Sequence, residues 1–171
     1  QADQISAHLE TIKDRFPANY FGDENETLQQ ALGKLLIDRK MTIGTVESCT
    51  GGALAQRIVS TPGSSKYYEG SMVTYSYDLK DRLVGVSQDD LWKHGAVSQE
   101  VVEQMAKGGL EKLDVDVCIS TSGIAGPDGG TEDKPVGTVW VAIATKEKVY
   151  SKKFQFKHNR ERNIESTVVY G

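Results

Sequence analysis

Apolar side chains recur along this chain with two different periods, and the two periods predict helices and strands. Spacings of three and four residues predict helices over 3–15, 26–39, 53–59, 88–93, 98–113 and 159–170. Short β-branched runs predict strands over 41–46, 70–77, 116–122, 136–145 and 148–157. A brief helical turn is expected over 79–83, and residues 16–24 are rich in loop formers.

The order of these segments predicts the architecture. Helices alternate with the early strands, which favours parallel pairing through crossover connections. The last two strands are separated only by Lys146 and Glu147, which predicts a hairpin. We therefore expect an α/β fold, a three-layer α/β/α sandwich around a mixed, mostly parallel sheet.

Charge and composition narrow the class of protein. The chain has 20 basic and 24 acidic residues, a net charge of −4, which argues against nucleic acid as the main partner. No apolar run approaches the roughly 18–20 residues of a membrane span. Cys49 and Cys118 form neither a disulfide framework nor a zinc motif. We expect a cytoplasmic protein without metal, cofactor, nucleic acid or membrane as a partner.

The first candidate site is the turn Glu47-Ser48-Cys49-Thr50-Gly51-Gly52, between a buried strand and a helix. Backbone N–H groups at such a junction can hold an oxyanion or a phosphate near a nucleophilic serine. An N-cap serine with packing glycines is the structural alternative, and spacing alone favours it. Cys49 is a rival nucleophile, because a helix N-terminus lowers a thiol pKa. His94 and His158 lie in separate segments, so no base is evident.

The second candidate is Lys80, four residues beyond Ser76 in Tyr75-Ser76-Tyr77-Asp78-Leu79-Lys80. The local pattern alone favours an ordinary solvated lysine. To serve as a base it must be neutral, and at a pKa of about 10.4 only about one lysine in 2,500 is neutral at pH 7. Lowering that pKa to about 7 takes roughly 4–5 kcal/mol, which a buried pocket can supply.

The third candidate is a glycine-rich loop after the strand 116–122, running from Ser122 to Gly130. It matches neither the Walker phosphate loop nor the dinucleotide fingerprint. It lies at the carboxyl end of an expected strand, where open α/β sheets bind ligands, and its glycines allow close approach of backbone to ligand. This loop is therefore expected to contact a ligand.

Five motifs in register carry a family resemblance: the Glu47–Gly52 turn, Tyr75-Ser76 with Lys80, His94-Gly95-Ala96-Val97-Ser98, the loop from Ser122 to Gly130, and Lys134-Pro135-Val136-Gly137-Thr138-Val139-Trp140. Residues 26–171 resemble the CinA C-terminal domain family of competence/damage-inducible proteins. Its enzymatic members are nicotinamide-nucleotide amidohydrolases of NAD salvage. The resemblance implies a hydrolase with a serine–lysine dyad that deamidates nicotinamide mononucleotide.

The same resemblance assigns roles to residues. Ser48 matches the nucleophile, Lys80 the general base and Tyr75 a supporting hydroxyl, while N–H groups around Thr50 and Gly51 would hold the oxyanion. The implied substrate-binding positions are Cys49, Thr50, Gly51, Gly52, Ser122, Gly123, Gly126, Gly129, Gly130 and Arg160. Two departures could reshape the pocket: Tyr77 stands where relatives often have Asn, and His158-Asn159-Arg160 stands where they commonly have Gly-Asp-Arg.

Residues 16–28 resemble the segment that joins the two halves of full-length CinA proteins. Together with the initial Gln1, this predicts a C-terminal fragment of a longer two-domain CinA protein. Residues 1–25 are then expected to be a helix and linker, and 26–171 the amidohydrolase domain. The resemblance implies an upstream molybdopterin-binding-like domain and a homodimer. The competing class is a non-catalytic module of a competence or damage-response protein that binds a nucleotide or a protein partner.

Overall fold

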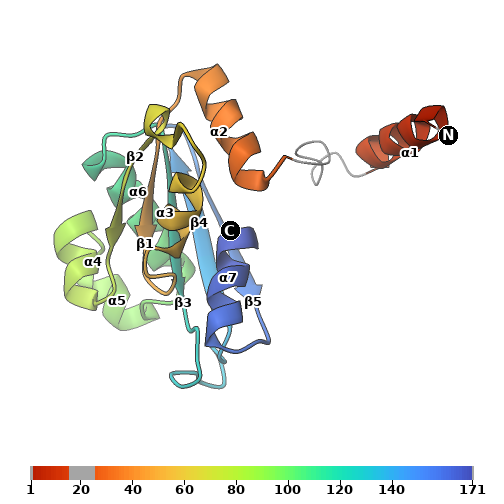
Figure 1. The fold of residues 1–171 in the computed structure, drawn as a ribbon. Helices are drawn as coiled ribbons and strands as arrows, with labels where there is room; N and C mark the ends of the chain where they lie inside the picture. The colour runs from red at the N-terminus through yellow and green to blue at the C-terminus, as the bar shows by residue number, and fades with distance from the viewer. Residues whose placement is uncertain (1, 16–25, 171) are drawn as a thin grey trace.

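The computed structural model describes residues 2–15 and 26–170, and in the second range five strands form one sheet (Figure 1). The strands are β1 (Ile43–Glu47), β2 (Tyr68–Val73), β3 (Val117–Gly123), β4 (Thr138–Thr145) and β5 (Val149–Gln155). Their order across the sheet is β2-β1-β3-β4-β5. β1 is parallel to β2 and β3, whereas β4 is antiparallel to β3 and β5. The predicted mixed sheet is confirmed.

Helices cover both faces of this sheet, which confirms the predicted three layers (Figure 1). One face carries α2 (Leu28–Arg39), α3 (Ala53–Val59) and α7 (Arg160–Tyr170). The other carries α4 (Tyr77–Val84), α5 (Gln88–His94) and α6 (Gln99–Lys112). A short 3-10 helix, η1 (Ser64–Lys66), lies between α3 and β2.

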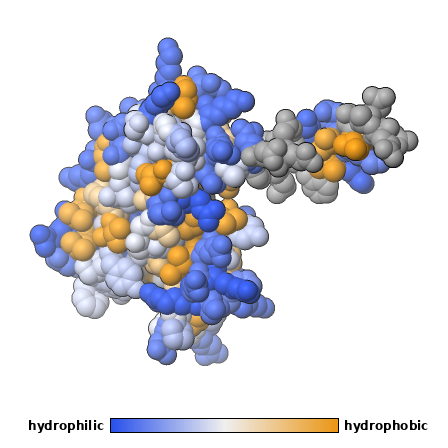
Figure 2. All heavy atoms as spheres, viewed as in Figure 1, coloured by the Kyte–Doolittle hydropathy of each residue, from blue (hydrophilic) through white to orange (hydrophobic). Residues whose placement is uncertain are grey.

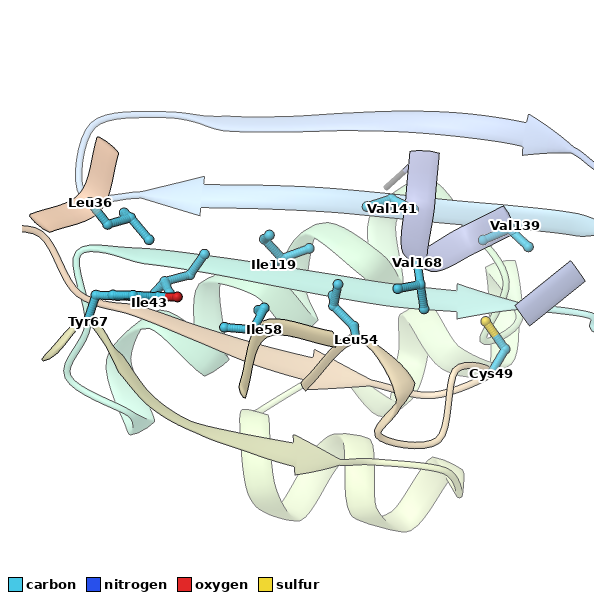
Figure 3. Close-up of a cluster of buried hydrophobic side chains, with 10 residues drawn as sticks. All are labelled: Leu36, Ile43, Cys49, Leu54, Ile58, Tyr67, Ile119, Val139, Val141 and Val168. Carbon is cyan, nitrogen blue, oxygen red and sulfur yellow. The ribbon is translucent and has the colours of Figure 1, made fainter. Parts of the chain in front are cut away.

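Each face has its own apolar core, because side chains alternate across the pleated strands. Figure 3 shows the cluster beneath α2, α3 and α7, where Ile43 of β1 and Ile119 of β3 meet Leu54 and Val168. On the opposite face Val46 packs with Met105 of α6. Burial of these aliphatic side chains from both faces stabilises the sandwich.

Helix α6 approaches its neighbours closely through two glycines. A Cβ at Gly109 would overlap Val46 of β1 and Cys118 of β3. A Cβ at Gly108 would overlap the backbone carbonyl of Val84, at the end of α4. Because α4 rests on the surface of α6 at this point, α6 helps to fix the position of every residue that α4 carries.

The strand predicted over 70–77 is wrong in its second half. β2 ends at Val73, and Ser76 is the N-cap of α4, its Oγ accepting a hydrogen bond from the Leu79 N–H at 3.1 Å. The alternation of Tyr75, Ser76 and Tyr77 imitates a strand, but the serine caps a helix instead. The helical turn expected over 79–83 is the body of this α4 helix.

The helix predicted over 3–15 is confirmed as α1 (Ala2–Arg15), which Figure 1 shows apart from the sheet. The side chains of Ile5, Leu9 and Ile12 are exposed on it, and Figure 2 shows hydrophobic surface there. The loop predicted over 16–24 lies outside the described residues. None of the helices in the described ranges has the length and apolar character needed to cross a membrane.

Candidate active site

The candidate residues gather at the edge of the sheet where β1, β2 and β3 end. Ser48 follows β1 directly, Thr74 and Tyr75 follow β2, and Ser122 lies near the end of β3. The Ser48 N–H donates to the Thr121 carbonyl at 3.0 Å, and the Thr74 N–H donates to the Glu47 carbonyl at 2.8 Å. Parallel strands thus bring segments distant in sequence to one edge, as expected for an open α/β sheet.

Lys80 reaches Ser48 from helix α4. Its Nζ donates to Ser48 Oγ at 3.0 Å, to the Thr74 carbonyl at 2.6 Å and to the Tyr75 carbonyl at 3.3 Å. The lysine has no exposed surface, and Ser48 is 8% exposed. The two side chains that the resemblance pairs are therefore in direct contact at a buried position.

Burial changes the acid–base behaviour of Lys80. The loss of water around the ammonium group lowers the pKa of Lys80 from 10.5 to about 8. At pH 7 about one molecule in ten then carries a neutral amine, compared with about one in 2,500 for a free lysine. A neutral amine at this distance can accept the Ser48 hydroxyl proton.

The thiol of Cys49 has the opposite character. It is 6% exposed and belongs to the apolar cluster under α3 and α7, among whose side chains Figure 3 shows it. Burial raises the pKa of this thiol to about 12, and the nearby Glu47 carboxylate also raises it, while Lys80 lowers it. Cys49 is thus a protonated core side chain, and only its backbone faces the turn. The rival thiol nucleophile lacks the thiolate that it needs.

The turn after Ser48 is held by Glu47, which the sequence did not mark as functional. The buried carboxylate accepts hydrogen bonds from the N–H groups of Gly52 at 2.9 Å, Leu54 at 3.1 Å and Ala55 at 2.8 Å. The Gly51 N–H donates to the Ser48 carbonyl at 3.2 Å. Gly51 and Gly52 are therefore engaged within the turn, contrary to the expectation that Gly51 would hold an oxyanion.

Two neighbouring N–H groups of the turn remain available for an oxyanion, and the one at Thr50 is among those expected. Among the residues that the structure describes, the backbone N–H groups of Cys49 and Thr50 make no hydrogen bond to another residue. Both follow the serine directly, as donors for an oxyanion at a nucleophile do. The Thr50 side chain is bound instead to Thr121, with 2.7 Å between the two hydroxyl oxygens.

Ser122 does not present its hydroxyl to a ligand. It has no exposed surface, and its Oγ donates to the Ala96 carbonyl at 2.7 Å. Ala96 belongs to the segment 94–98, which Tyr77 also contacts. The Tyr77 hydroxyl accepts from the Ala96 N–H at 3.2 Å, and the Tyr77 ring contacts Trp92 edge-on. The hydroxyls of Ser122 and Tyr77 both bind the backbone of Ala96. The two side chains therefore support the segment 94–98.

Arg160, the first residue of α7, closes another side of the site. Its Nη1 donates to the Gly126 carbonyl at 2.8 Å and its Nη2 to the Tyr75 hydroxyl at 3.2 Å. The hydroxyl of Tyr75 thus contacts the arginine, and only the backbone carbonyl of Tyr75 contacts Lys80. Gly123 is half-buried and Gly126 is buried, whereas Gly129 and Gly130 lie at the exposed tip of the loop.

Asn163 is a supporting residue that sequence reasoning missed. It is buried, and its amide group donates to the carbonyls of Ala125 at 3.0 Å and His158 at 2.9 Å. It thereby joins α7 to the glycine-rich loop and fixes the segment before Arg160.

In the described ranges, no group of three or more His, Cys, Asp or Glu side chains is placed to hold a metal ion.

Residues 25–171 match the model of the CinA C-terminal domain. The chain belongs to this family. A CinA-like protein of Endomicrobium trichonymphae is 47% identical over 150 residues, covering 88% of this chain, and one of Cytophaga hutchinsonii is 42% identical over 166 residues, covering 97%. This chain spans 35% and 40% of the length of these two relatives.

A solved structure agrees with this assignment. The competence/damage inducible protein CihA from Agrobacterium tumefaciens is 31% identical, with a TM-score of 0.83. The match covers 89% of this chain and 93% of that one. This CinA C-terminal domain therefore has the fold of its family along most of its length.

Proposed function

We propose that this CinA C-terminal domain is a serine amidohydrolase that converts nicotinamide mononucleotide to nicotinic acid mononucleotide and ammonia in pyridine nucleotide salvage. The observation that carries the proposal is the buried contact of 3.0 Å between Lys80 Nζ and Ser48 Oγ, with the pKa of Lys80 lowered to about 8. A serine and a neutral amine in contact are the parts of a nucleophile and its base. The choice of substrate rests on the family resemblance.

The first half-reaction forms an acyl-enzyme. Neutral Lys80 takes the Ser48 hydroxyl proton while the serine oxygen bonds to the carboxamide carbon of the pyridine ring. The N–H groups of Cys49 and Thr50 stabilise the oxyanion, each by about 3–4 kcal/mol when well placed. The carbon–nitrogen bond then breaks, and Lys80 returns its proton to the departing ammonia.

The second half-reaction releases the acid. Neutral Lys80 now takes a proton from water as the water oxygen attacks the ester carbon. The bond to Ser48 Oγ breaks, and the proton on Lys80 passes back to the serine. One water is consumed, ammonia and a carboxylic acid are formed, and the dyad is restored.

Arg160 is the proposed binding group for the 5′-phosphate. Its guanidinium lies between the glycine-rich loop and Tyr75, at the border of the Ser48 site. A planar guanidinium can hold a phosphate through two parallel hydrogen bonds. The phosphate is not expected at the start of α3, because Glu47 already accepts hydrogen bonds from that turn.

The test is ammonia release from nicotinamide mononucleotide by the wild type, Ser48→Ala and Lys80→Met. We expect both variants to lose at least about a hundredfold in kcat. Two matched controls are Cys49→Ala beside the serine and Lys134→Met, a lysine that donates to the His94 carbonyl. Both should stay within several-fold of the wild type.

Two results would overturn the proposal. Full activity in Ser48→Ala, with Cys49→Ala inactive, would make the thiol the nucleophile. No turnover in a folded wild type, while nicotinamide mononucleotide still raises its melting temperature, would indicate a nucleotide-binding module instead.

A further inference from the structure

Glu47 is a buried carboxylate whose charge is balanced by backbone groups. It has no exposed surface, and in the described ranges no Lys, Arg or His forms an ion pair with it. Burying an unpaired carboxylate is costly unless strong donors surround it. The shortest bonds come from three N–H groups at the start of α3, those of Gly52, Leu54 and Ala55. The hydroxyls of Thr45 at 3.4 Å and Ser71 at 3.5 Å donate to the same carboxylate.

These bonds fix both ends of the turn that carries the nucleophile. At one end the Ser48 N–H donates to Thr121 of β3, and at the other Glu47 binds Gly52. Gly51 and Gly52 between them have φ of 59° and 101°, a region that glycine adopts without strain. Within the turn from 48 to 52 and the helix start, only the N–H groups of Cys49 and Thr50 donate to no other residue.

We propose that Glu47 is a positioning residue for catalysis, which sets the Ser48–Gly52 turn so that the Cys49 and Thr50 N–H groups face the reacting carbonyl. Its catalytic consequence rests on the proposed function. Glu47 acts through the backbone, because its carboxylate contacts the helix start and does not touch Ser48 Oγ or Lys80. Without it, the serine and its base remain, but the oxyanion donors lose their fixed place.

Asp116 provides a matched control at the other end of the strands. Its Oδ2 accepts from the Thr42 N–H at 2.9 Å, just before β1 begins. It is thus a second carboxylate that accepts a hydrogen bond from backbone next to β1, but it lies away from Ser48. Asp116→Asn tests the loss of such a carboxylate–backbone hydrogen bond without any effect on the Ser48–Gly52 turn.

The experiment compares Glu47→Gln, Glu47→Asp and Asp116→Asn. Glutamine keeps the size of the side chain but places an NH₂ donor against backbone N–H groups, whereas aspartate keeps the charge on a shorter stem. We measure kcat and KM for nicotinamide mononucleotide, the melting temperature, and the rate at which a fluorophosphonate probe modifies Ser48. The probe reports serine reactivity and the oxyanion donors without needing the natural substrate.

We expect Glu47→Gln to lower kcat about a hundredfold, with KM changed less than about threefold, and to slow phosphonylation at least about tenfold. Glu47→Asp should recover part of both rates, and Asp116→Asn should leave both unchanged at a lowered melting temperature. If Glu47→Gln does not fold, the test rests on Glu47→Asp, which must then show a smaller fall in kcat at constant KM.

The proposal is overturned if folded Glu47 variants phosphonylate Ser48 at the wild-type rate and lose only melting temperature, as Asp116→Asn does. Failure of the proposed function is distinguishable from this result. A wild type that releases no ammonia from nicotinamide mononucleotide but reacts with the fluorophosphonate still allows the Glu47 comparison.

Discussion

At the scale of single residues, the pKa of Lys80 sets the pH dependence of the proposed reaction. Because the neutral amine is the base and its pKa is about 8, kcat/KM should rise about tenfold per pH unit below that value and level off above it. Initial rates between pH 6 and 9.5 test this, with Lys80→Arg inactive throughout as the control. A flat profile, or an inflection near pH 6.5, would assign the base to another group.

Arg160 should affect substrate affinity more than chemistry. Its guanidinium contacts Gly126 and Tyr75, and neither Ser48 nor Lys80 is among its partners. We expect Arg160→Met to raise KM about tenfold while kcat changes less than about threefold, as loss of uniform binding does. Tyr75→Phe, which removes one of the two contacts of the arginine, should raise KM less. A large fall in kcat at constant KM would place Arg160 in the chemical step.

At the scale of elements, the contact between α6 and α4 links packing to the site. Alanine at Gly108 would overlap the Val84 carbonyl, so α4 must shift, and Lys80 with it. We expect Gly108→Ala to lower the free energy of unfolding by about 1–3 kcal/mol and also to reduce kcat. Denaturant unfolding and steady-state rates measure the two effects. Lys107→Ala, exposed on the same helix, should change neither.

The sequence predicted most elements because their patterns are local. Where two local signals competed, as at Tyr75-Ser76-Tyr77, the alternation of aromatic residues suggested a strand and the capping serine was overlooked. This error concealed part of the site, because the helix that Ser76 caps brings Lys80 to Ser48. The boundary of an element here matters more than its existence.

At the scale of the whole molecule, the buried lysine should lower stability in a pH-dependent way. Its folded-state pKa of about 8 lies below 10.5, so between these values the unfolded chain binds more protons and stability rises with pH. Below pH 8 the charged, buried Lys80 lowers the free energy of unfolding by its full amount, about 3 kcal/mol. Three hydrogen bonds partly offset this loss. Lys80→Met should therefore be inactive but at least as stable as the wild type at pH 7.

The difference in stability between Lys80→Met and the wild type should shrink from pH 8 to 10, because the wild type becomes more stable as Lys80 loses its proton. Denaturant unfolding of both proteins at pH 7 and pH 9.5 measures the difference. A variant less stable than the wild type at pH 7, by the same amount at both pH values, would show that the hydrogen bonds of Lys80 outweigh its burial.

The candidate site was only partly visible in the sequence, because its contacts join distant segments. Ser48 and Lys80 lie 32 residues apart, and only the family resemblance paired them before the fold was known. The hydroxyl of Ser122 was expected at the ligand and binds Ala96 instead. Glu47 gave no signal, since a carboxylate ending an apolar strand does not show which amides it will bind.

The buried thiol of Cys49 has a consequence for the chemical durability of the domain. With a pKa of about 12, only about one thiol in 100,000 is ionised at pH 7, and oxidants and alkylating agents attack the ionised form. A hydrolase with this residue beside its nucleophile would keep working through peroxide exposure that silences thiol enzymes. Reagents aimed at serine should inactivate it, while iodoacetamide should leave it untouched.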